Sequence, residues 1–405
     1  MMKLNRRFPA AVAALGFLAL GGSVRAASAQ SLFASRGLGY LNAPLDGRAR
    51  GLGGVGTGLP GANLSLVNPA GIAGLQAPAI LVAFQPDFYS SDAGGASNSG
   101  TTARFPLIQV AAPFGTRWAA SAGYGTYLDQ SWSAERQDTL SFTGRAPVTV
   151  TDRFVSRGGV ARLRLGGAYG VTERIAIGAG LDIFTGELRD TLTRVLNADT
   201  ALGGTVFTPS RQGTAWGYRG VGGTVGARWT PVEALNLAAA VSFGGQLRAR
   251  PTGDSVSKLG LSGKEYTLPV TVNAGASGRV SVGALLAVSG EWARWSASDA
   301  DLAAVGGARD SWSLAGGVEW DGSREGRSSF PVRVGARYSA LPFRWQGTGS
   351  DFPTEKALTA GLGGRLAGGA AMIDLAGERG WRGGSSAGLD ERYWRLTASL
   401  TLLAR

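Results

Sequence analysis

The chain has 405 residues, of which 65 are glycine, and it contains neither cysteine nor histidine. These absences exclude disulfide frameworks, Cys/His zinc sites and catalytic triads built on histidine. The formal net charge of +12 comes from dispersed basic residues and not from long basic runs, which argues against nucleic-acid binding. An apolar content of 44% is too high for a disordered chain.

Residues 1–29 predict a cleaved export signal. A short basic start is followed by an apolar run at 10–20 and by the small residues Ala27-Ser28-Ala29. A helix over the apolar run would cover only about 16 Å, too short to span a bilayer. We therefore expect an exported protein whose mature chain begins at Gln30.

The rest of the sequence alternates with a period of two. In residues 175–183, for example, Ile175, Ile177 and Leu181 fall on one face, while Gly178 and Asp182 fall on the other. Such alternation predicts strands with one apolar face. Fourteen segments of this kind follow one another, from about 79–85 to about 391–402.

The connections between these segments alternate between short and long. Short turns are expected near 115–116 and 170–174, and long loops near 86–103 and 188–213. An even strand number with short turns at one end and long loops at the other is typical of outer-membrane barrels. Charged residues on the second face are then expected to pair inside the lumen, with direct binding of substrate as the alternative role. They are Arg162, Arg164, Asp182, Glu291, Glu319, Arg333, Arg337, Arg365, Asp374 and Arg395.

Residues 30–78 do not alternate. A glycine-rich stretch at 51–61 is followed by Asn68-Pro69-Ala70-Gly71, where Asn-Pro marks a sharp turn. The GLGGVG run within this stretch lacks the preceding strand and following helix of a dinucleotide site. The segment therefore predicts a compact, non-strand unit that precedes the barrel.

The order of these features resembles the FadL family of outer-membrane transporters. At the N-terminal end these features are Leu32 and Phe33, the glycine-rich stretch, Asn68-Pro69-Ala70 and a first strand over 79–84. Near the C-terminus the segments 330–343, 354–366 and 370–381 resemble the same family. The resemblance implies a 14-stranded antiparallel transmembrane β-barrel with an N-terminal hatch inside its lumen. The implied division is a signal peptide at 1–29, a hatch at 30–78 and a barrel at 79–405, located in the outer membrane of a Gram-negative-type bacterium. Family members end in an aromatic residue that assembly reads, whereas this sequence ends in Leu-Leu-Ala-Arg.

The same resemblance implies passive transport of long-chain fatty acids or other hydrophobic small molecules, without enzymatic activity, cofactor or metal. Capture would occur at extracellular loops and release through the barrel wall. The implied partners are the transported molecules and the surrounding lipid and lipopolysaccharide, with the protein as a monomer. Residues 51–71 resemble PorV-like proteins about equally well, so a scaffold barrel in protein secretion is the alternative.

Three groups of candidate site residues follow from the sequence and the resemblance. The hatch motif is Asn68, Pro69, Ala70 and Gly71. Candidate ligand-binding residues, for which packing alone is the alternative role, are Leu32, Phe33, Phe88, Phe142, Phe343 and Trp345. Candidates for a lateral gate are Gly123 and Gly125 in the third strand, because glycine within a strand often marks a bulge.

Overall fold

The computed structural model describes residues 31–93, 96–141, 147–197, 209–253, 260–321, 330–345, 352–383 and 388–404. The expected export signal and Phe142 lie outside these residues. No helix within the described ranges is long and apolar enough to cross a membrane.

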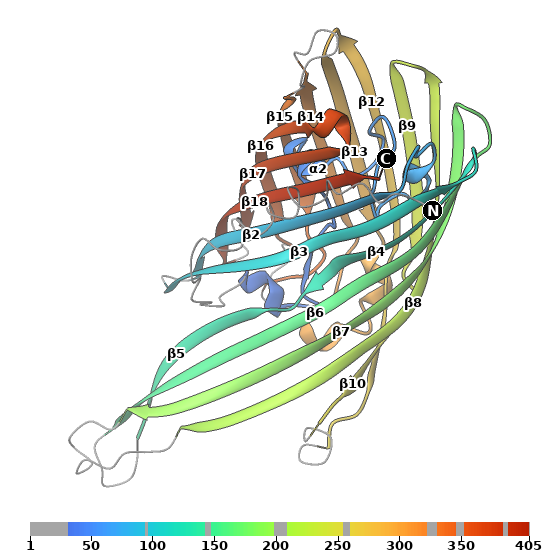
Figure 1. Cartoon of the computed structure of the whole chain (residues 1–405). Helices are drawn as coiled ribbons and strands as arrows, with labels where there is room; N and C mark the ends of the chain where they lie inside the picture. Colours follow the sequence, from blue (N-terminus) through green and yellow to red (C-terminus); the bar gives the residue numbers. More distant parts are fainter. Residues whose placement is uncertain are drawn as a thin grey trace, which may run out of the picture.

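Antiparallel strands form a closed barrel of fourteen strands, which confirms the expected fold class (Figure 1). The barrel closes where β18 pairs with β2 and where β9 pairs with β12. In chain order the wall strands are β2 (Ala79–Ala93), β3 (Ala96–Phe114), β4 (Trp118–Asp129), β6 (Val148–Gly170), β7 (Ile175–Asn197), β8 (Ser210–Val232), β9 (Leu235–Phe243), β12 (Val270–Ser281), β13 (Ala284–Ala293), β14 (Ser311–Trp320), β15 (Val332–Ala340), β16 (Thr354–Leu366), β17 (Ala371–Gly383) and β18 (Asp390–Leu403).

Three further strands lengthen the wall at its long-loop end: β5 (Trp132–Leu140), β10 (Gln246–Pro251) and β11 (Lys264–Thr267). With the ends of β6, β7 and β8, which have 23 residues each, they form an extended arm that projects past the other strands (Figure 1). Much of 86–103 and 188–213, expected as loop, is therefore strand. Beyond the lipid neither face of a strand needs to be apolar. The strands therefore remain hydrogen-bonded to each other after the apolar–polar alternation of their sequence has ended.

The outward face of the wall is apolar, with exposed residues such as Leu165, Ile177, Val225 and Leu314. Exposed tryptophans lie at both edges of this face. Trp312 and Trp320, at opposite ends of β14, are separated by about 27 Å of strand. Because barrel strands are tilted by about 35–45°, this length covers roughly 20 Å of membrane height, close to the apolar band of about 25 Å that aromatic girdles flank in outer-membrane barrels.

Residues 31–78 lie inside the barrel and contact strands on opposite sides of it. Their elements are η1 (Leu32–Ser35), β1 (Tyr40–Leu41), α2 (Gly47–Gly51) and η2 (Pro69–Ile72). Helix α2 packs against β15 to β18, whereas η2 packs against β6, β7 and β8. Close approach requires glycine at Gly53, where φ is +81° and a Cβ would lie 2.4 Å from the carbonyl oxygen of Ala336. We call residues 31–78 the hatch segment.

Short 3-10 turns complete the described chain: η4 (Trp295–Ser298), η5 (Ala303–Val305) and η6 (Ala367–Gly369). The first two lie in the connection between β13 and β14 at the long-loop end. Trp295 and Leu302 are buried there, so this connection packs back into the barrel.

Candidate functional site

The barrel wall is interrupted between β3 and β4. Within the described residues their ladder runs from Phe114 opposite Trp118 to Leu107 opposite Gly125, and there it ends. Strand β3 continues alongside β2, and β4 continues to Asp129. We call the space between residues 96–106 and 126–129 the β3–β4 gap.

The hatch segment covers the edge of β4 at this gap. Tyr40 lies opposite Asp129 and Leu41 lies opposite Leu128, so β1 takes the place that β3 has left. The backbone N–H of Asn42 donates to the carbonyl oxygen of Tyr127 at 3.1 Å. The wall is thus closed at this point by a two-residue strand from inside the lumen.

On the side that faces β6, β4 has a β-bulge at the level of the gap. The register between β4 and β6 shifts between Thr126 and Leu128. Such bulges bend a strand and redirect a side chain. The Tyr127 ring lies 5.0 Å from the Phe184 ring, between centroids. The bulge therefore points an aromatic ring into the lumen beside the gap.

An apolar cluster extends from the long-loop end to this gap. Leu128 and Phe184 belong to it, and Leu41 packs against it. At its far end the rings of Trp295 and Phe343 meet edge to face at 5.1 Å. Other buried members are Leu38, Val160, Leu188, Tyr218, Leu247, Leu268 and Leu302. We call this group the upper apolar cluster.

Three of the predicted ligand-binding residues come together near this cluster. Phe343 is buried in it and packs against Gly37, whose φ of +55° and missing side chain leave room for the ring. Phe33 meets Trp345 edge to face at 5.9 Å. The Leu32 backbone N–H donates to Glu391 Oε2 at 3.2 Å, which fixes the start of the hatch segment.

Phe88 is placed differently from expectation. It was expected in a capture loop, but it lies on β2 opposite Trp394 and is 44% exposed on the outward face. The physical reason is the continuation of β2 beyond residue 86, which turns every second side chain outward.

Gly123 and Gly125 do not break the ladder of β4, since each has a paired partner on both β3 and β6. They leave room for the hatch segment instead. A Cβ at Gly125 would lie 2.6 Å from Leu66 Cδ1 and 2.8 Å from Pro44 Cβ. The ladder between β3 and β4 ends directly beyond Gly125, so the gap lies next to the predicted lateral-gate glycines and not at them.

The hatch motif forms a buried turn tied to the wall. Asn68 caps η2, and its Oδ1 accepts a hydrogen bond from the Ala70 N–H at 2.9 Å. Its Nδ2 donates to the carbonyl oxygens of Ala227 on β8 at 3.0 Å and Ala239 on β9 at 3.3 Å. Pro69 is buried beside it, and the Gly71 N–H donates to the Asn68 carbonyl oxygen at 3.1 Å. This turn holds one side of the hatch segment.

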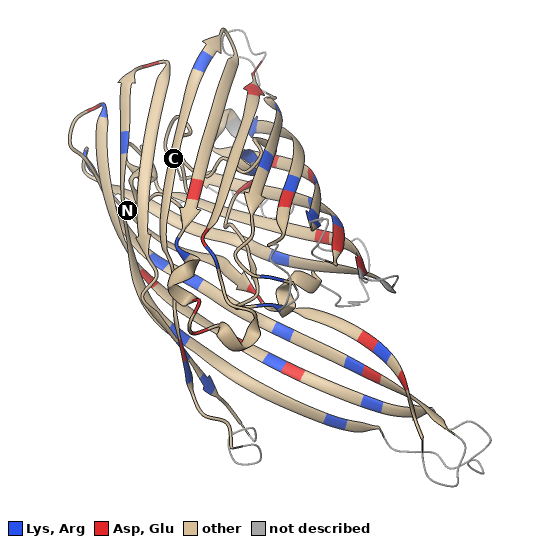
Figure 2. Ribbon diagram, turned by 180° about the vertical axis from the view of Figure 1, so that it is seen from behind, with Lys and Arg blue, Asp and Glu red and all other residues tan. Residues whose placement is uncertain are grey.

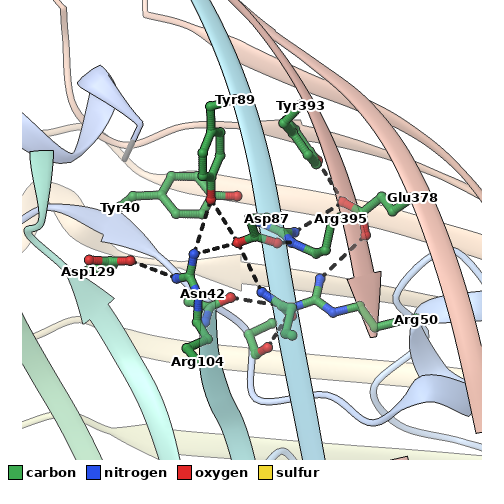
Figure 3. Close-up of polar contacts among 12 residues, drawn as sticks. Tyr40, Asn42, Arg50, Asp87, Tyr89, Arg104, Asp129, Glu378, Tyr393 and Arg395 are labelled. Carbon is green, nitrogen blue, oxygen red and sulfur yellow. Dashed lines mark hydrogen bonds and ion pairs between the residues drawn. The ribbon is translucent and has the colours of Figure 1, made fainter. Parts of the chain in front are cut away.

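A buried ionic network holds the other side (Figure 3). Asp87, on β2, accepts hydrogen bonds from Arg395 Nε at 2.8 Å, from the Tyr89 hydroxyl at 2.8 Å and from Arg104. Arg104 also binds Asp129 at 2.7 Å. Because Arg104 lies on β3 and Asp129 on β4, this ion pair bridges the β3–β4 gap.

Glu378 connects the network to helix α2. It accepts hydrogen bonds from Arg337 at 2.6 Å and from the Tyr393 hydroxyl at 2.6 Å, and it pairs with Arg50 of α2 at 3.7 Å. Arg50 in turn donates to the Ala43 carbonyl oxygen at 2.7 Å, close to β1. The hatch helix, the segment beside the gap and the wall thus share one set of charges.

Sequence analysis anticipated part of this network. Pairing inside the lumen is confirmed for Arg164 with Asp182 at 2.6 Å and for Arg333 with Glu319 at 2.6 Å, whereas Arg365 is exposed. Asp87 was missed because it lies where a loop was expected, and Arg104 directly follows that expected loop. The available signal was the Asp-x-Tyr spacing of Asp87 and Tyr89, which places both side chains on one face of a strand.

Helix α2 carries an acidic cap. Asp46 Oδ1 accepts a hydrogen bond from the Ala49 N–H at 2.8 Å. Burial, and then the nearby Asp374 carboxylate, raise the pKa of Asp46 to about 6. Next to the hatch segment a cavity of about 170 Å³ is lined by polar groups that include Tyr40, Arg162 and Glu291.

Three solved structures share the fold over most of their length. The chain is 15% identical to the CymD monoaromatic hydrocarbon channel (TM-score 0.55; 89% of this chain and 97% of that chain covered). It is 14% identical to a Pseudomonas aeruginosa FadL homologue (0.58; 90% and 99%) and 15% identical to the Pseudomonas putida toluene transporter TodX (0.54; 89% and 97%). The FadL-type barrel expected from the sequence is thereby confirmed at the level of the fold.

A search among curated proteins finds no match to this sequence. A comparison with protein-family models does find one, described as BamG, over residues 8–254. Because this match covers more than half of the sequence, the chain belongs to the BamG family.

Proposed function

We propose that this protein is an outer-membrane passive transporter for hydrophobic small molecules, including long-chain fatty acids. The observation that carries the proposal is the continuity of the upper apolar cluster with the β3–β4 gap. Leu128 belongs to both, and within the described residues β1 and the Arg104–Asp129 ion pair separate them from the outside of the wall. The FadL, TodX and CymD folds support the same class of function.

In the proposed route a solute enters from the long-loop end, which faces the cell exterior. It is held by apolar side chains around Trp295 and Phe343. Withdrawal of residues 38–42 then exposes the edge of β4 beside the gap. Outside the gap, Phe105 is 49% exposed and its ring lies 5.3 Å from that of Phe84, so the exit opens onto an apolar surface.

The test is to lock β1 onto β4. Leu41 and Leu128 face each other across the ladder, and the chain has no cysteine of its own. Directly opposed residues in antiparallel strands are at a distance that a disulfide can span. We expect oxidised L41C/L128C to lose most uptake of a fluorescent long-chain fatty acid and of toluene, and to regain it on reduction.

A matched control places the same crosslink elsewhere in the wall. Ala276 and Val288 are opposed on β12 and β13, on the outward face and away from the gap. Oxidised A276C/V288C should transport like the wild type. Full uptake by oxidised L41C/L128C, with the crosslink verified by mass spectrometry, would rule out exit through the β3–β4 gap.

A second candidate function is a scaffold barrel associated with protein secretion. It is favoured by the packing of the lumen, where the cavity beside the hatch segment measures only about 170 Å³. Stable co-purification of one protein partner in mild detergent, together with absent uptake in the assay above, would favour the scaffold over the transporter.

A further inference from the structure

The outward face of the extended arm changes from apolar to basic along the same strands. On β7 the exposed Ile175, Ile177 and Ile183 are followed, on the same face, by Arg189. On β8 the exposed Val221 is followed by Arg219. Because side chains alternate along a strand, these residues all point away from the barrel axis. The outward surface thus changes from apolar to arginine-rich beyond its apolar edge, within two residues on β8 and within six on β7.

The arginines lie in register across neighbouring strands. Arg157 on β6 is directly opposite Arg189 on β7, and Arg219 on β8 is directly opposite Arg248 on β10. Like charges placed opposite each other repel and destabilise a sheet. An anion bound between two such exposed arginines would relieve their repulsion.

Four arginines, among them Arg157 and Arg189, surround a hollow of about 430 Å³ on the arm. Guanidinium and hydroxyl donors line it together with one apolar side chain. The lining residues are Arg153, Val155, Arg157, Arg189, Thr191, Thr193 and Arg211. Arg189 stands six residues beyond Ile183, about 20 Å along a tilted strand. Planar guanidinium groups bind phosphate through paired hydrogen bonds.

Acidic residues only partly balance this face. Glu187 pairs with Arg189 at 2.7 Å, Glu265 pairs with Arg248 at 2.9 Å, and Glu135 lies opposite Arg153. Among the described residues of this face, the arginines outnumber these glutamates. The other face of the arm is more evenly matched, with Arg194 and Asp152 paired at 2.6 Å (Figure 2 shows the bands of charge along the arm).

We propose that this face, the arginine band, binds the phosphate groups of lipopolysaccharide in the outer leaflet. The apolar edge places the band where headgroup and inner-sugar phosphates lie, and the positive excess complements them. Bound glycolipid would then brace the arm against the membrane surface. The inference rests on the outer-membrane location within the proposed function but does not depend on transport.

The experiment compares purified full-length protein with R153Q/R157Q/R189Q/R211Q in nanodiscs. The probes are fluorescent rough lipopolysaccharide, the same glycolipid after enzymatic dephosphorylation, and inorganic phosphate as competitor. A lost charge-assisted contact costs enough that we expect at least about tenfold weaker binding by the variant. The wild type should lose a similar factor on dephosphorylated glycolipid and should weaken as salt is raised.

The matched control is R117Q/R174Q/R279Q, which removes exposed arginines at the short-turn end. It should bind like the wild type. If the fourfold variant does not assemble, R157Q/R189Q and R153Q/R211Q carry the same expectation. Unchanged binding by assembled variants, equal binding of dephosphorylated glycolipid, or full competition by millimolar phosphate would overturn the proposal. Uptake, measured on the same preparations, reports separately on transport.

Discussion

The side-chain amide of Asn68 donates a hydrogen bond to the carbonyl oxygen of Ala227, 3.0 Å away and 159 positions along the chain. A single residue of the hatch segment thus anchors its own turn and reaches the barrel wall. The opposite side of the same segment is held by charges. These are two of several attachments between the hatch segment and the wall, which also include Arg48 with Glu319 and Arg228 with the Gly61 carbonyl oxygen. Each of the two can be weakened by substitution.

Asn68→Ala should loosen the first attachment. The change removes the donors to Ala227 and Ala239 and the cap of η2, leaving buried carbonyl oxygens without that partner. We expect a loss of about 1–3 kcal/mol in local stability. Hydrogen exchange of residues 68–73 should accelerate while the wall strands stay protected. Gln76→Ala, at an exposed site in the same segment, is the control; equal exchange in both variants would contradict the anchoring role.

Arg395→Gln should weaken the second attachment. It leaves the fully buried Asp87 without one of its ion-pair partners, which typically costs about 3–5 kcal/mol. The double variant D87N/R395Q should recover part of this loss because no buried charge remains uncompensated. Unfolding in urea in the presence of lipid vesicles measures the free energy of unfolding of the single and the double variant.

The exposed ion pair of Arg248 and Glu265 is the control for the Asp87 and Arg395 variants. Arg248→Gln should change the free energy of unfolding by less than about 1 kcal/mol. Equal effects of Arg248→Gln and Arg395→Gln would show that the buried network does not stabilise the fold.

Gly125→Leu should displace the hatch segment from β4. The new side chain would occupy the positions of Leu66 and Pro44, whose nearest atoms lie within 2.8 Å of a Cβ. We expect the amides of Leu128 and Asp129 to exchange faster while the barrel assembles normally. Gly167→Leu is the matched control, because a Cβ there meets its nearest atom only at 3.9 Å. Unchanged protection of β4 in Gly125→Leu would argue against the close fit.

Docking of α2 should depend on pH through Asp46. Its pKa of about 6 lies above the ordinary value of about 3.9, so the folded protein binds the proton more tightly than the unfolded chain. The stabilising contribution is therefore complete at about pH 4 and is lost as the pH rises through about 6. Arg48, Arg333 and Asp374 also act on this carboxyl group.

Asp46→Asn keeps an oxygen that can accept the Ala49 N–H but removes the titration. Hydrogen exchange of residues 47–51 should slow from about pH 7 to about pH 5 in the wild type, after correction for intrinsic rates, and not in this variant. Asp301→Asn, in an exposed loop, should behave like the wild type. An identical pH profile in Asp46→Asn would assign the dependence to another group.

The barrel could be predicted from the sequence because lipid imposes an apolar side chain at every second wall position. This constraint ends at the membrane edge, so alternation could not show that β2 continues through Phe88 or that the arm exists. Asn68 could be predicted because Asn followed by Pro is typical of a sharp turn. The β3–β4 gap did not, because it depends on register between Leu107 and Gly125 and on β1, which has only two residues.

The shortness of β1 sets an energy scale for opening the wall. Withdrawal of β1 breaks two cross-strand pairs, the hydrogen bonds from Tyr40 to Glu355 and from Asn42 to Thr126, and the packing of Leu41 against the upper apolar cluster. Each hydrogen bond has a net value of about 0.5–1.5 kcal/mol, and the contacts that the segment makes in its withdrawn position offset part of the total. A difference of a few kcal/mol leaves an open population of roughly 0.1–10%. Thermal motion alone would then operate such a valve on the microsecond-to-millisecond scale, with neither nucleotide hydrolysis nor a membrane potential to drive it.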